Sequence, residues 1–353
     1  MSLLINSDNM GAALMGGLIL SAGGSGERKA ERNRALAQMA LITGPLILKQ
    51  LDELKDDAQI IVATGVSAPG FGAGHAGPED AVESARMLLR HTGFKHPAGV
   101  MPAHVPGVLA WVQAAVLGLP LIDAATNGRG HPTLMLGSMS APGDDPVSIC
   151  QAGCGGARDS RITVLTTGPL PMTAAVMRAA SIENRGTLHA TRGPYSAAFV
   201  KKGGAPGAVS RAMAIGSTWL DAPRGMPQIE AVAECLGGEV VALGRVARCD
   251  VTYRNGYDIG RVAIWDGGNT LELNACNEWM TAAYGGFRIA TFPDLICTFD
   301  PESGKPLAVS EMTVDRRVAV VRCASTALPV GAGARDPAAL AEVSQLMGVS
   351  MQA

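Results

Sequence analysis

The sequence of 353 residues contains few aromatic and few charged side chains. Aromatic residues make up 4% and charged residues 17%, and 29 Lys and Arg against 31 Asp and Glu leave a formal net charge of −2. No basic stripe is present, which argues against a protein that follows nucleic-acid phosphates. With so few aromatic residues, the core must be built from Ala, Val, Leu, Ile and Met, and small side chains suit layered α/β packing.

The sequence also lacks the marks of membrane and secreted proteins. No run of about 18 apolar residues occurs, so we expect no segment that spans a bilayer. The start, MSLLINSDNM, lacks the basic and apolar regions of a signal peptide. Seven scattered cysteines, an odd number, do not fit a disulfide framework. We therefore expect a cytoplasmic protein whose partner is a small molecule, with neither nucleic acid nor membrane involved.

Hydrophobic residues make up 47% of the chain, which is enough to form a large buried core. The length of 353 residues favours two domains. Helical and strand-like segments alternate over 1–170, which predicts a three-layer α/β domain with a mainly parallel sheet. An Ala-rich stretch over 171–222 predicts a helical connector packed on that domain. Short Val- and Ile-rich segments over 223–330 predict a mostly-β, barrel-like domain. The tail, 331–353, reads as a helix capped by Asp336.

A glycine cluster in LILSAGGSGE, comprising Gly23, Gly24, Ser25 and Gly26, precedes a predicted helix. It lacks the Lys of a Walker loop, and Lys29 stands where the third glycine of a dinucleotide fingerprint belongs. The nucleophile-elbow pattern is also broken. Two interpretations stay open. The backbone N–H groups cradle an anion at the helix N-terminus, or the segment is a turn between helices that requires positive φ.

The segment GLPLIDAATNGRGHPTLML groups polar side chains behind a predicted strand that ends at Asp123. Asn127, Arg129 and His131 follow in a loop. Ligands of open parallel sheets bind beyond the carboxyl ends of the strands. An Arg can clamp a carboxylate, and a His can act as acid, base or metal ligand. The alternative is an Asp–Arg pair that merely ties down the loop.

Several short segments occur here in an order that is found in one family. They are the glycine cluster, ATGVSAPG around Pro69, Asp123 followed by Gly128, Arg129 and Pro132, the pair Asn277–Glu278, and PDLI followed by the turn Asp300 to Gly304. The chain resembles the S-methyl thiohydantoin desulfurase family, whose genes lie beside those of hydantoinase and oxoprolinase subunits. The resemblance spans nearly the whole chain. It implies an N-terminal three-layer α/β domain, a C-terminal barrel-like domain, and a helix start after Asn277–Glu278. The implied activity is replacement of a sulfur substituent on a thiohydantoin-type ring by water.

The chain also departs from this family's pattern. MPAHVPGV, with His104, replaces an acidic segment, Ala125 replaces a second Asp, and the fourth glycine of the loop is missing. Two other functions therefore stay open. The chain is a non-catalytic partner subunit of a hydantoinase- or oxoprolinase-type enzyme, or it is a small-anion binding protein. In each case we expect a homo-oligomer.

For the enzymatic hypothesis we assign roles residue by residue. Asp123 would orient or activate water, and Arg129 would hold an anionic substituent. Protons would be moved by His131, His104 or Glu278. The predicted substrate-binding set is Gly23, Gly24, Ser25, Gly26, Pro69, His104, Asn127, Arg129 and Asn277. These roles require the glycine cluster and the segment DAATNGRGH to face each other across a hollow between the two domains.

A metal site is the remaining hypothesis. Cys150 and Cys154 are spaced C-x₃-C, and thiolates favour zinc. His75, His104 or His131 could complete such a site. The alternative is that both cysteines pack in the core. No cofactor is required by the sequence, and zinc stays open.

Overall fold

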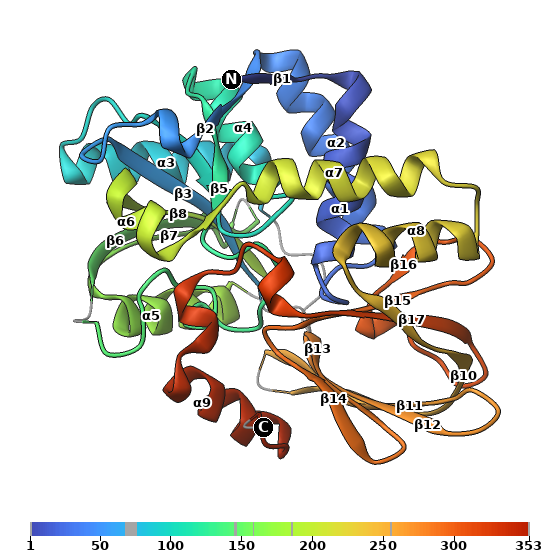
Figure 1. The fold of residues 1–353 in the computed structure, drawn as a ribbon. Coiled ribbons are helices and arrows are strands. Elements are labelled where there is room, and N and C mark those ends of the chain that lie inside the picture. Colours follow the sequence, from blue (N-terminus) through green and yellow to red (C-terminus); the bar gives the residue numbers. More distant parts are fainter. Residues whose placement is uncertain are drawn as a thin grey trace.

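The computed structural model describes residues 2–67, 76–144, 147–157, 159–184, 186–254 and 256–351. Two sheets lie side by side (Figure 1), a nine-stranded one in the N-terminal half and an eight-stranded one in the C-terminal half. The predicted two-part architecture is thereby confirmed. Within the described ranges, no helix has the length and apolar character needed to cross a bilayer.

The centre of the N-terminal sheet consists of parallel strands, and antiparallel strands extend it on both sides. Side chains alternate between two apolar cores along these strands. In the third strand, Ile60 and Val62 face one core, and Ile61 and Ala63 face the other. In spatial order the strands are β1 (Leu3–Ile5), β2 (Leu46–Gln50), β5 (Leu121–Ala125), β4 (Gly99–Pro102), β3 (Gln59–Ser67), β8 (Thr187–Ser196), β6 (Ser148–Gly155) and β7 (Ile162–Pro169), and β9 (Ala205–Pro206) pairs with β5.

Helices cover both faces of this sheet and complete the three layers (Figure 1). One face carries α2 (Glu27–Thr43), α3 (Pro78–Thr92) and α4 (Val108–Leu117). The other face carries α5 (Leu170–Glu183) and α6 (Ala197–Gly203). The short 3₁₀ helices among the described residues are η1 (Leu51–Glu53), η3 (Val309–Glu311), η4 (Ser325–Ala327) and η5 (Ala332–Arg335).

The interval 171–222 is not wholly helical, contrary to our prediction. Its residues Thr187–Ser196 form β8, a strand inside the N-terminal sheet. The sequence TLHATRGPYS lacks a two-residue apolar period because both faces of β8 are covered, so the pattern did not indicate a strand. The same reason applies to β6, SICQAGCG, which the sequence analysis also missed.

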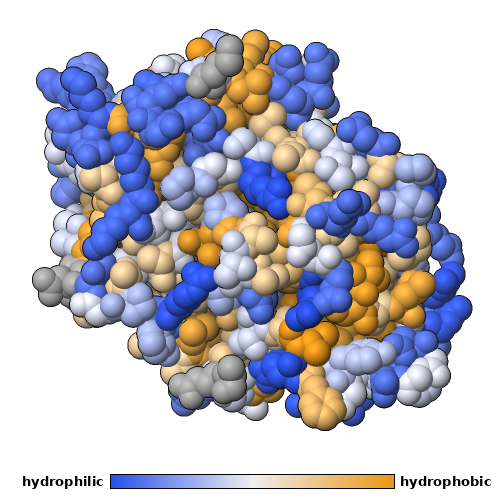
Figure 2. Space-filling model, viewed as in Figure 1, coloured by the Kyte–Doolittle hydropathy of each residue, from blue (hydrophilic) through white to orange (hydrophobic). Residues whose placement is uncertain are grey.

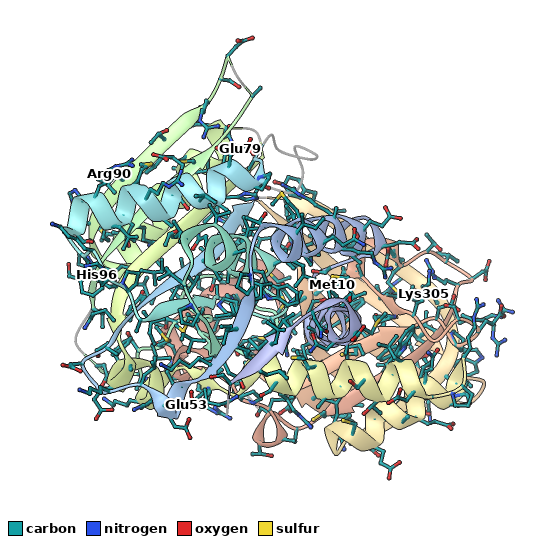
Figure 3. The ribbon with its side chains drawn as sticks, turned by 90° about the horizontal axis from the view of Figure 1, so that it is seen from above. Met10, Glu53, Glu79, Arg90, His96 and Lys305 are labelled. Carbon is teal, nitrogen blue, oxygen red and sulfur yellow. The ribbon has the colours of Figure 1, made fainter. Side chains whose placement is uncertain are left out.

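The first helix, α1 (Ser7–Leu20), packs closely against α7 (Ala208–Asp221). A Cβ on Gly16 would lie 1.7 Å from the carbonyl oxygen of Ala212, and one on Gly216 would lie 1.8 Å from that of Ala12. Glycine is therefore required there by close approach of the two helix backbones. Seen from above (Figure 3), α1, labelled at Met10, lies between the α3 side and the C-terminal half, labelled at Lys305.

The C-terminal sheet is antiparallel throughout its eight strands and curls into a half-barrel. Register shifts in β10 bend it around an apolar interior. Asp336 caps α9 as predicted, because its carboxylate accepts from the N–H of Ala339 at 2.8 Å. In order the strands are β14 (Phe287–Thr291), β13 (Glu278–Tyr284), β12 (Thr270–Cys276), β11 (Tyr257–Trp265), β10 (Glu239–Arg254), β17 (Arg317–Cys323), β15 (Leu295–Phe299) and β16 (Pro306–Leu307), with α8 (Met226–Leu236) and α9 (Pro337–Met347) beside them.

Glu278 begins the strand β13 and not a helix, so the implied helix start after Asn277–Glu278 is wrong.

On the face shown in Figure 2, apolar side chains form small areas separated by hydrophilic ones.

Candidate functional site

The glycine cluster and the segment DAATNGRGH lie against each other in direct backbone contact, whereas we had predicted that they face each other across a hollow. The described residues that line the large cavity include none of the glycine cluster. The N–H of Gly130 donates to the carbonyl oxygen of Leu20 at 2.8 Å. A Cβ on Gly130 would lie only 2.4 Å from the carbonyl oxygen of Ser21. Ala22 and Gly23 have φ values of +52° and +86°, so the turn adopts the left-handed conformation that one of our two interpretations proposed.

The same turn docks the C-terminal sheet. The N–H of Trp279 donates to the carbonyl oxygen of Ala22 at 2.8 Å, and that of Val309 donates to Gly23 at 2.9 Å. A Cβ on Gly23 would lie 2.7 Å from Nε1 of Trp279, and one on Gly24 would lie 2.3 Å from Oε1 of Glu278. Glycine is needed here because the two halves of the molecule approach at backbone distance.

The N-terminus of α2 is already paired with a carboxylate of the protein itself. Oε1 of Glu311 accepts from the N–H of Glu27 at 2.9 Å, and Oε2 accepts from the N–H of Ala308 at 2.8 Å. A Cβ on Gly26 would lie 2.7 Å from the same Oε1, and Ser25 is buried. The predicted cradle for a substrate anion is therefore not supported at this helix end.

Asp123 is fully buried and its carboxylate is satisfied by the protein. Its oxygens accept from the N–H groups of Val209 and Ser210, both at 3.0 Å, from the Ser210 hydroxyl, and from Nε2 of Gln50 at 3.1 Å. These bonds cap the N-terminus of α7. The predicted role of Asp123 in activating water is not supported by this geometry.

Arg129 is also fully buried, and it ties the loop to the C-terminal sheet. Its guanidinium donates to the carbonyl oxygens of Gly130 at 2.9 Å, of Trp279 at 3.2 Å and of Asp294. It lies 4.6 Å from the centre of the Phe292 ring. Burial lowers its pKa to about 10, against the opposing charge of Glu278. Arg129 is thus a structural tie, as the alternative interpretation held, although its partner is not Asp123.

The two predicted asparagines have structural contacts as well. Nδ2 of the buried Asn127 donates to the carbonyl oxygen of Leu136 at 3.3 Å. Asn277 has a φ of +59°, and its Oδ1 accepts from the N–H of Asp258 at 2.9 Å. Both residues shape turns. Pro69 and His75 lie outside the described residues.

A cavity of about 410 Å³ lies between the two domains, along the last residues of β3 and beyond the carboxyl end of β4. Two predicted site residues, His104 and His131, line it. Arg192 of β8 and Arg178 of α5 are in its wall, with Tyr257 from the C-terminal sheet. This volume is in the range of small-molecule sites.

The two histidines form one unit in this wall. Their ring centres are 5.7 Å apart and their planes perpendicular. Nδ1 of His131 lies 2.9 Å from the carbonyl oxygen of Thr133, and Nδ1 of His104 lies 3.1 Å from that of Val105. A carbonyl only accepts, so we assign the proton of each ring to Nδ1 and a lone pair to Nε2. Nε2 of His131 is buried and has no partner among the described residues.

Both imidazoles are neutral at pH 7. Burial lowers the pKa of His104 to about 4, with a further contribution from the charge of Lys29. Burial lowers the pKa of His131 to about 3, and His104 contributes as well. The Nε2 lone pairs therefore act as hydrogen-bond or proton acceptors.

Glu278 approaches the same corner from the C-terminal half. Its side chain fills the space left by Gly24 and Gly130, and its Oε2 has no partner in the described part of the chain. Burial raises the pKa of this carboxyl to about 7, against the opposing charges of Arg129 and Lys29. Glu278 is not among the described residues that line the cavity.

Lys29 was noted in the sequence only because it breaks a glycine pattern. Its side chain is open to solvent, yet surrounding protein lowers its pKa, while Glu278 opposes this shift. Lys29 lies within electrostatic reach of both Glu278 and His104.

Sequence analysis missed Arg192, because the segment was interpreted as helical. The side chain is only 2% exposed, and Nη2 donates to Oγ1 of Thr126 at 3.0 Å. Nε has no partner among the described residues, and no carboxylate there is bonded to the guanidinium. A strand interpretation of TLHATRGPYS would have indicated a charged residue on a buried strand, which is a signal for function.

Within the described ranges, the cysteine pair belongs to no cluster of metal ligands. Cys150 and Cys154 are buried in β6, and Sγ of Cys154 lies 3.3 Å from Sδ of Met87. Burial raises the pKa of both thiols, which disfavours the thiolate that zinc requires. Among the residues with described positions, no group of three potential metal ligands occurs.

Comparisons with known proteins agree with this architecture. A family model described as S-Me-THD-like, N-terminal domain, matches residues 9–162, and one described as S-Me-THD-like, C-terminal domain, matches residues 171–331. The fold is similar to the crystal structure of a protein from Chromobacterium violaceum, with a TM-score of 0.70 and 20% identity over 98% of this chain and 97% of that chain. No curated protein sequence matches the chain at a significant level.

Proposed function

Because the two matched models cover most of its length, this chain belongs to the S-Me-THD-like family, and we propose that it replaces a sulfur substituent on a hydantoin-like ring by water. The oxygen of water bonds to the ring carbon, the carbon–sulfur bond breaks, and the sulfur leaves as a thiol. One proton of water ends on the ring nitrogen and the other on the thiol. The observation that carries the proposal is the His104–His131 pair, which lines the large cavity.

The polarity of the cavity supports a cyclic amide as substrate. Two Nε2 lone pairs accept hydrogen bonds, and a hydantoin-like ring offers N–H donors in its plane. The unpartnered Nε2 of His131 is buried, and a buried acceptor without a partner costs stability unless a ligand satisfies it.

Proton transfer is assigned to the same pair. Because both imidazoles are neutral at pH 7, the His104–His131 pair would take a proton from the attacking water and return it to the departing sulfur.

An anionic substituent on the ring would bind to Arg192. We transfer this role from Arg129, since the guanidinium of Arg129 is engaged by backbone carbonyls. Arg192 is buried beside the cavity without a carboxylate partner among the described residues.

All seven cysteines are free thiols, which supports a reducing, cytoplasmic setting. The expected homo-oligomer and the hydantoinase-like partner stay predictions.

A second candidate is a small-anion binding protein without turnover. Arg192, buried and without a carboxylate partner among the described residues, favours it as much as it favours the enzyme. The two candidates differ in the role of the histidines, since binding of an anion does not require neutral imidazoles.

The test is turnover of S-alkyl thiohydantoins by the purified full chain. Thiol release is followed with a thiol-reactive chromophore, and hydantoin formation by mass spectrometry. We expect His131→Asn to lower kcat at least about 100-fold, the usual effect of removing an acid–base group. The matched control is His91→Asn, which changes an exposed histidine of α3 and should leave kcat unchanged. Absence of thiol release by the wild type, or equal kcat in both variants, would contradict the enzymatic proposal. Tight binding of an acidic hydantoin without turnover would favour the anion-binding protein.

A further inference from the structure

We infer that Thr126 is a positioning residue that sets the preference of this site for rings with an anionic substituent, by fixing the guanidinium of Arg192. The inference rests on the proposed function, because it concerns the substrate of the same cavity. It is carried by the hydrogen bonds of one buried hydroxyl.

Thr126 follows β5 directly and is 1% exposed. Its hydroxyl donates to the carbonyl oxygen of Ala103 at 2.8 Å. A hydroxyl has one proton, so Oγ1 can only accept from its other neighbour. That neighbour is Nη2 of Arg192, at 3.0 Å. The Ala103 carbonyl is itself held, since it also accepts from the N–H of Asn127 at 3.0 Å. The direction of the lone pair that meets Arg192 is therefore fixed.

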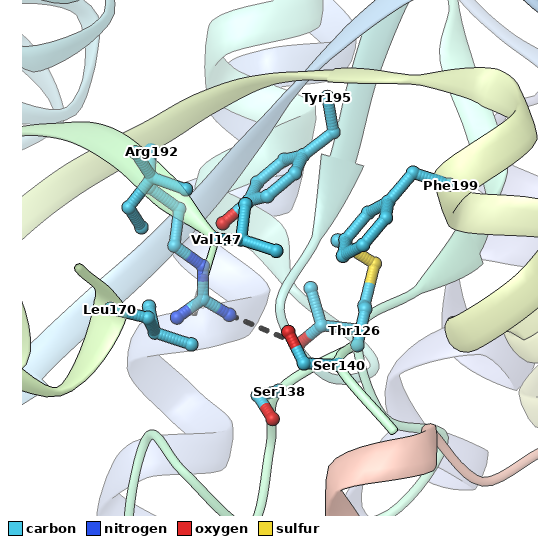
Figure 4. Close-up of a pocket in the computed structure, with 10 residues that line it drawn as sticks. Thr126, Ser138, Ser140, Val147, Leu170, Arg192, Tyr195 and Phe199 are labelled. Carbon is cyan, nitrogen blue, oxygen red and sulfur yellow. Dashed lines mark hydrogen bonds between the residues drawn. The ribbon is translucent and has the colours of Figure 1, made fainter. Parts of the chain in front are cut away.

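Arg192 lies in the wall between two cavities. One is the large cavity with the histidines, and the other has a volume of about 10 Å³ and includes Tyr195 and Ser140 (Figure 4). The bond to Thr126, dashed in Figure 4, is the one hydrogen bond of this guanidinium to a described side chain. Thr126 itself lines the small cavity. Without its bond, no other hydrogen bond among the described contacts holds the guanidinium in one orientation, and the position of Arg192 in the wall of the large cavity would change.

The effect should be selective for charge. A ring with a carboxymethyl substituent uses the guanidinium, whereas the same ring with a methyl substituent does not. Loss of the Thr126 hydroxyl should therefore weaken binding of the acidic ring and leave kcat for both rings unchanged.

The experiment compares Thr126→Val, Thr126→Ser and the control Ser140→Ala in the full chain. KM and kcat are measured for S-methyl thiohydantoins that carry carboxymethyl or methyl on the ring. We expect Thr126→Val to raise KM for the acidic substrate about 10- to 100-fold, the usual effect of a lost hydrogen bond to a charged group. KM for the methyl compound should change less than about threefold, within the effect of an ordinary substitution. Thr126→Ser, which keeps the hydroxyl, and Ser140→Ala, which removes one from the small cavity, should resemble the wild type.

Equal losses for both substrates, or failure of Thr126→Ser to restore KM, would overturn the inference and indicate a purely structural role. Should the valine variant not fold, Thr126→Ala takes its place in the same comparison. If the wild type turns over neither compound, the proposed function fails, and binding of 5-carboxymethyl hydantoin is then measured by calorimetry. Weaker binding by Thr126→Val than by Thr126→Ser would still support the role of Thr126, and equal affinities would overturn it.

Discussion

Replacement of Glu278 by Gln should make the protein more stable at neutral and alkaline pH, although it removes a charge beside Arg129 and Lys29. The side chain is 9% exposed and its Oε2 has no partner among the described residues. Burial raises the pKa of this carboxyl from 4.5 to about 7 in the folded protein. Gln has the same shape, so the close contacts with Gly24 and Gly130 are kept.

The sign of the pH dependence follows from where the proton is held. Between pH 4.5 and about 7 the folded protein keeps a proton on Glu278 that the unfolded chain has lost. Rising pH therefore lowers the free energy of unfolding across this interval, and above it the contribution is constant. A shift of this size corresponds to about 3 kcal/mol. Glu278→Gln has no carboxyl at this position and therefore lacks this pH-dependent contribution to the free energy of unfolding.

Three histidines act in the opposite direction. Burial lowers the pKa of His104 to about 4, of His131 to about 3 and of His189 to about 4. They make the protein more stable as pH rises towards 6.5, the ordinary value for histidine. Because wild type and variant share these histidines, the difference between the two proteins isolates Glu278.

The assay is urea unfolding, followed by tryptophan fluorescence, in one buffer series from about pH 4.5 to 8, the range in which the carboxyl titrates. The free energy of unfolding of Glu278→Gln minus that of the wild type should increase by about 3 kcal/mol over this range. Glu272→Gln, on the neighbouring strand β12 and partly exposed, is the matched control and should follow the wild type. A difference that changes by less than about 1 kcal/mol, below the effect expected from linkage, would refute the reasoning.

Three further substitutions test the structural roles assigned above. Asp123→Ala should lower the free energy of unfolding by about 2–4 kcal/mol, because it removes the cap of α7 and leaves buried N–H groups unpaired. An unchanged midpoint of urea unfolding would contradict this capping role. Arg129→Lys should lower the free energy of unfolding by about 2–4 kcal/mol, since an ammonium group cannot donate to both Trp279 and Gly130 as the planar guanidinium does. A wild-type Tm in calorimetric unfolding would show that these bonds are dispensable. Gly130→Ala should lower the free energy of unfolding by about 2 kcal/mol or more, because the added Cβ would lie 2.4 Å from the Ser21 carbonyl oxygen. A wild-type Tm for this variant in calorimetric unfolding would mean that the turn can move.

The two-part architecture could be predicted from the sequence alone. Alternating helix and strand signals over 1–170 and dense short strands over 223–330 arise from local periodicity, which one chain is enough to reveal. The proximity of the glycine cluster and DAATNGRGH was a hypothesis from the sequence, and the structure replaces the predicted hollow between them with direct backbone contact. The loop after a parallel strand lies at the carboxyl edge of the sheet, where His104 and His131 are found as well.

The role of each polar side chain depends on contacts that form only in the folded chain. Asp123 and Arg129 look like reactive groups in the sequence, yet α7 and the C-terminal sheet, more than 80 residues away, take up their hydrogen-bonding capacity. Glu278 acquires its raised pKa because two glycines from other segments close over it. Arg192 and Thr126 come together only because β8 enters the N-terminal sheet. Hydrogen-bond partners and desolvation depend on contacts between distant parts of the chain, and no local pattern encodes them.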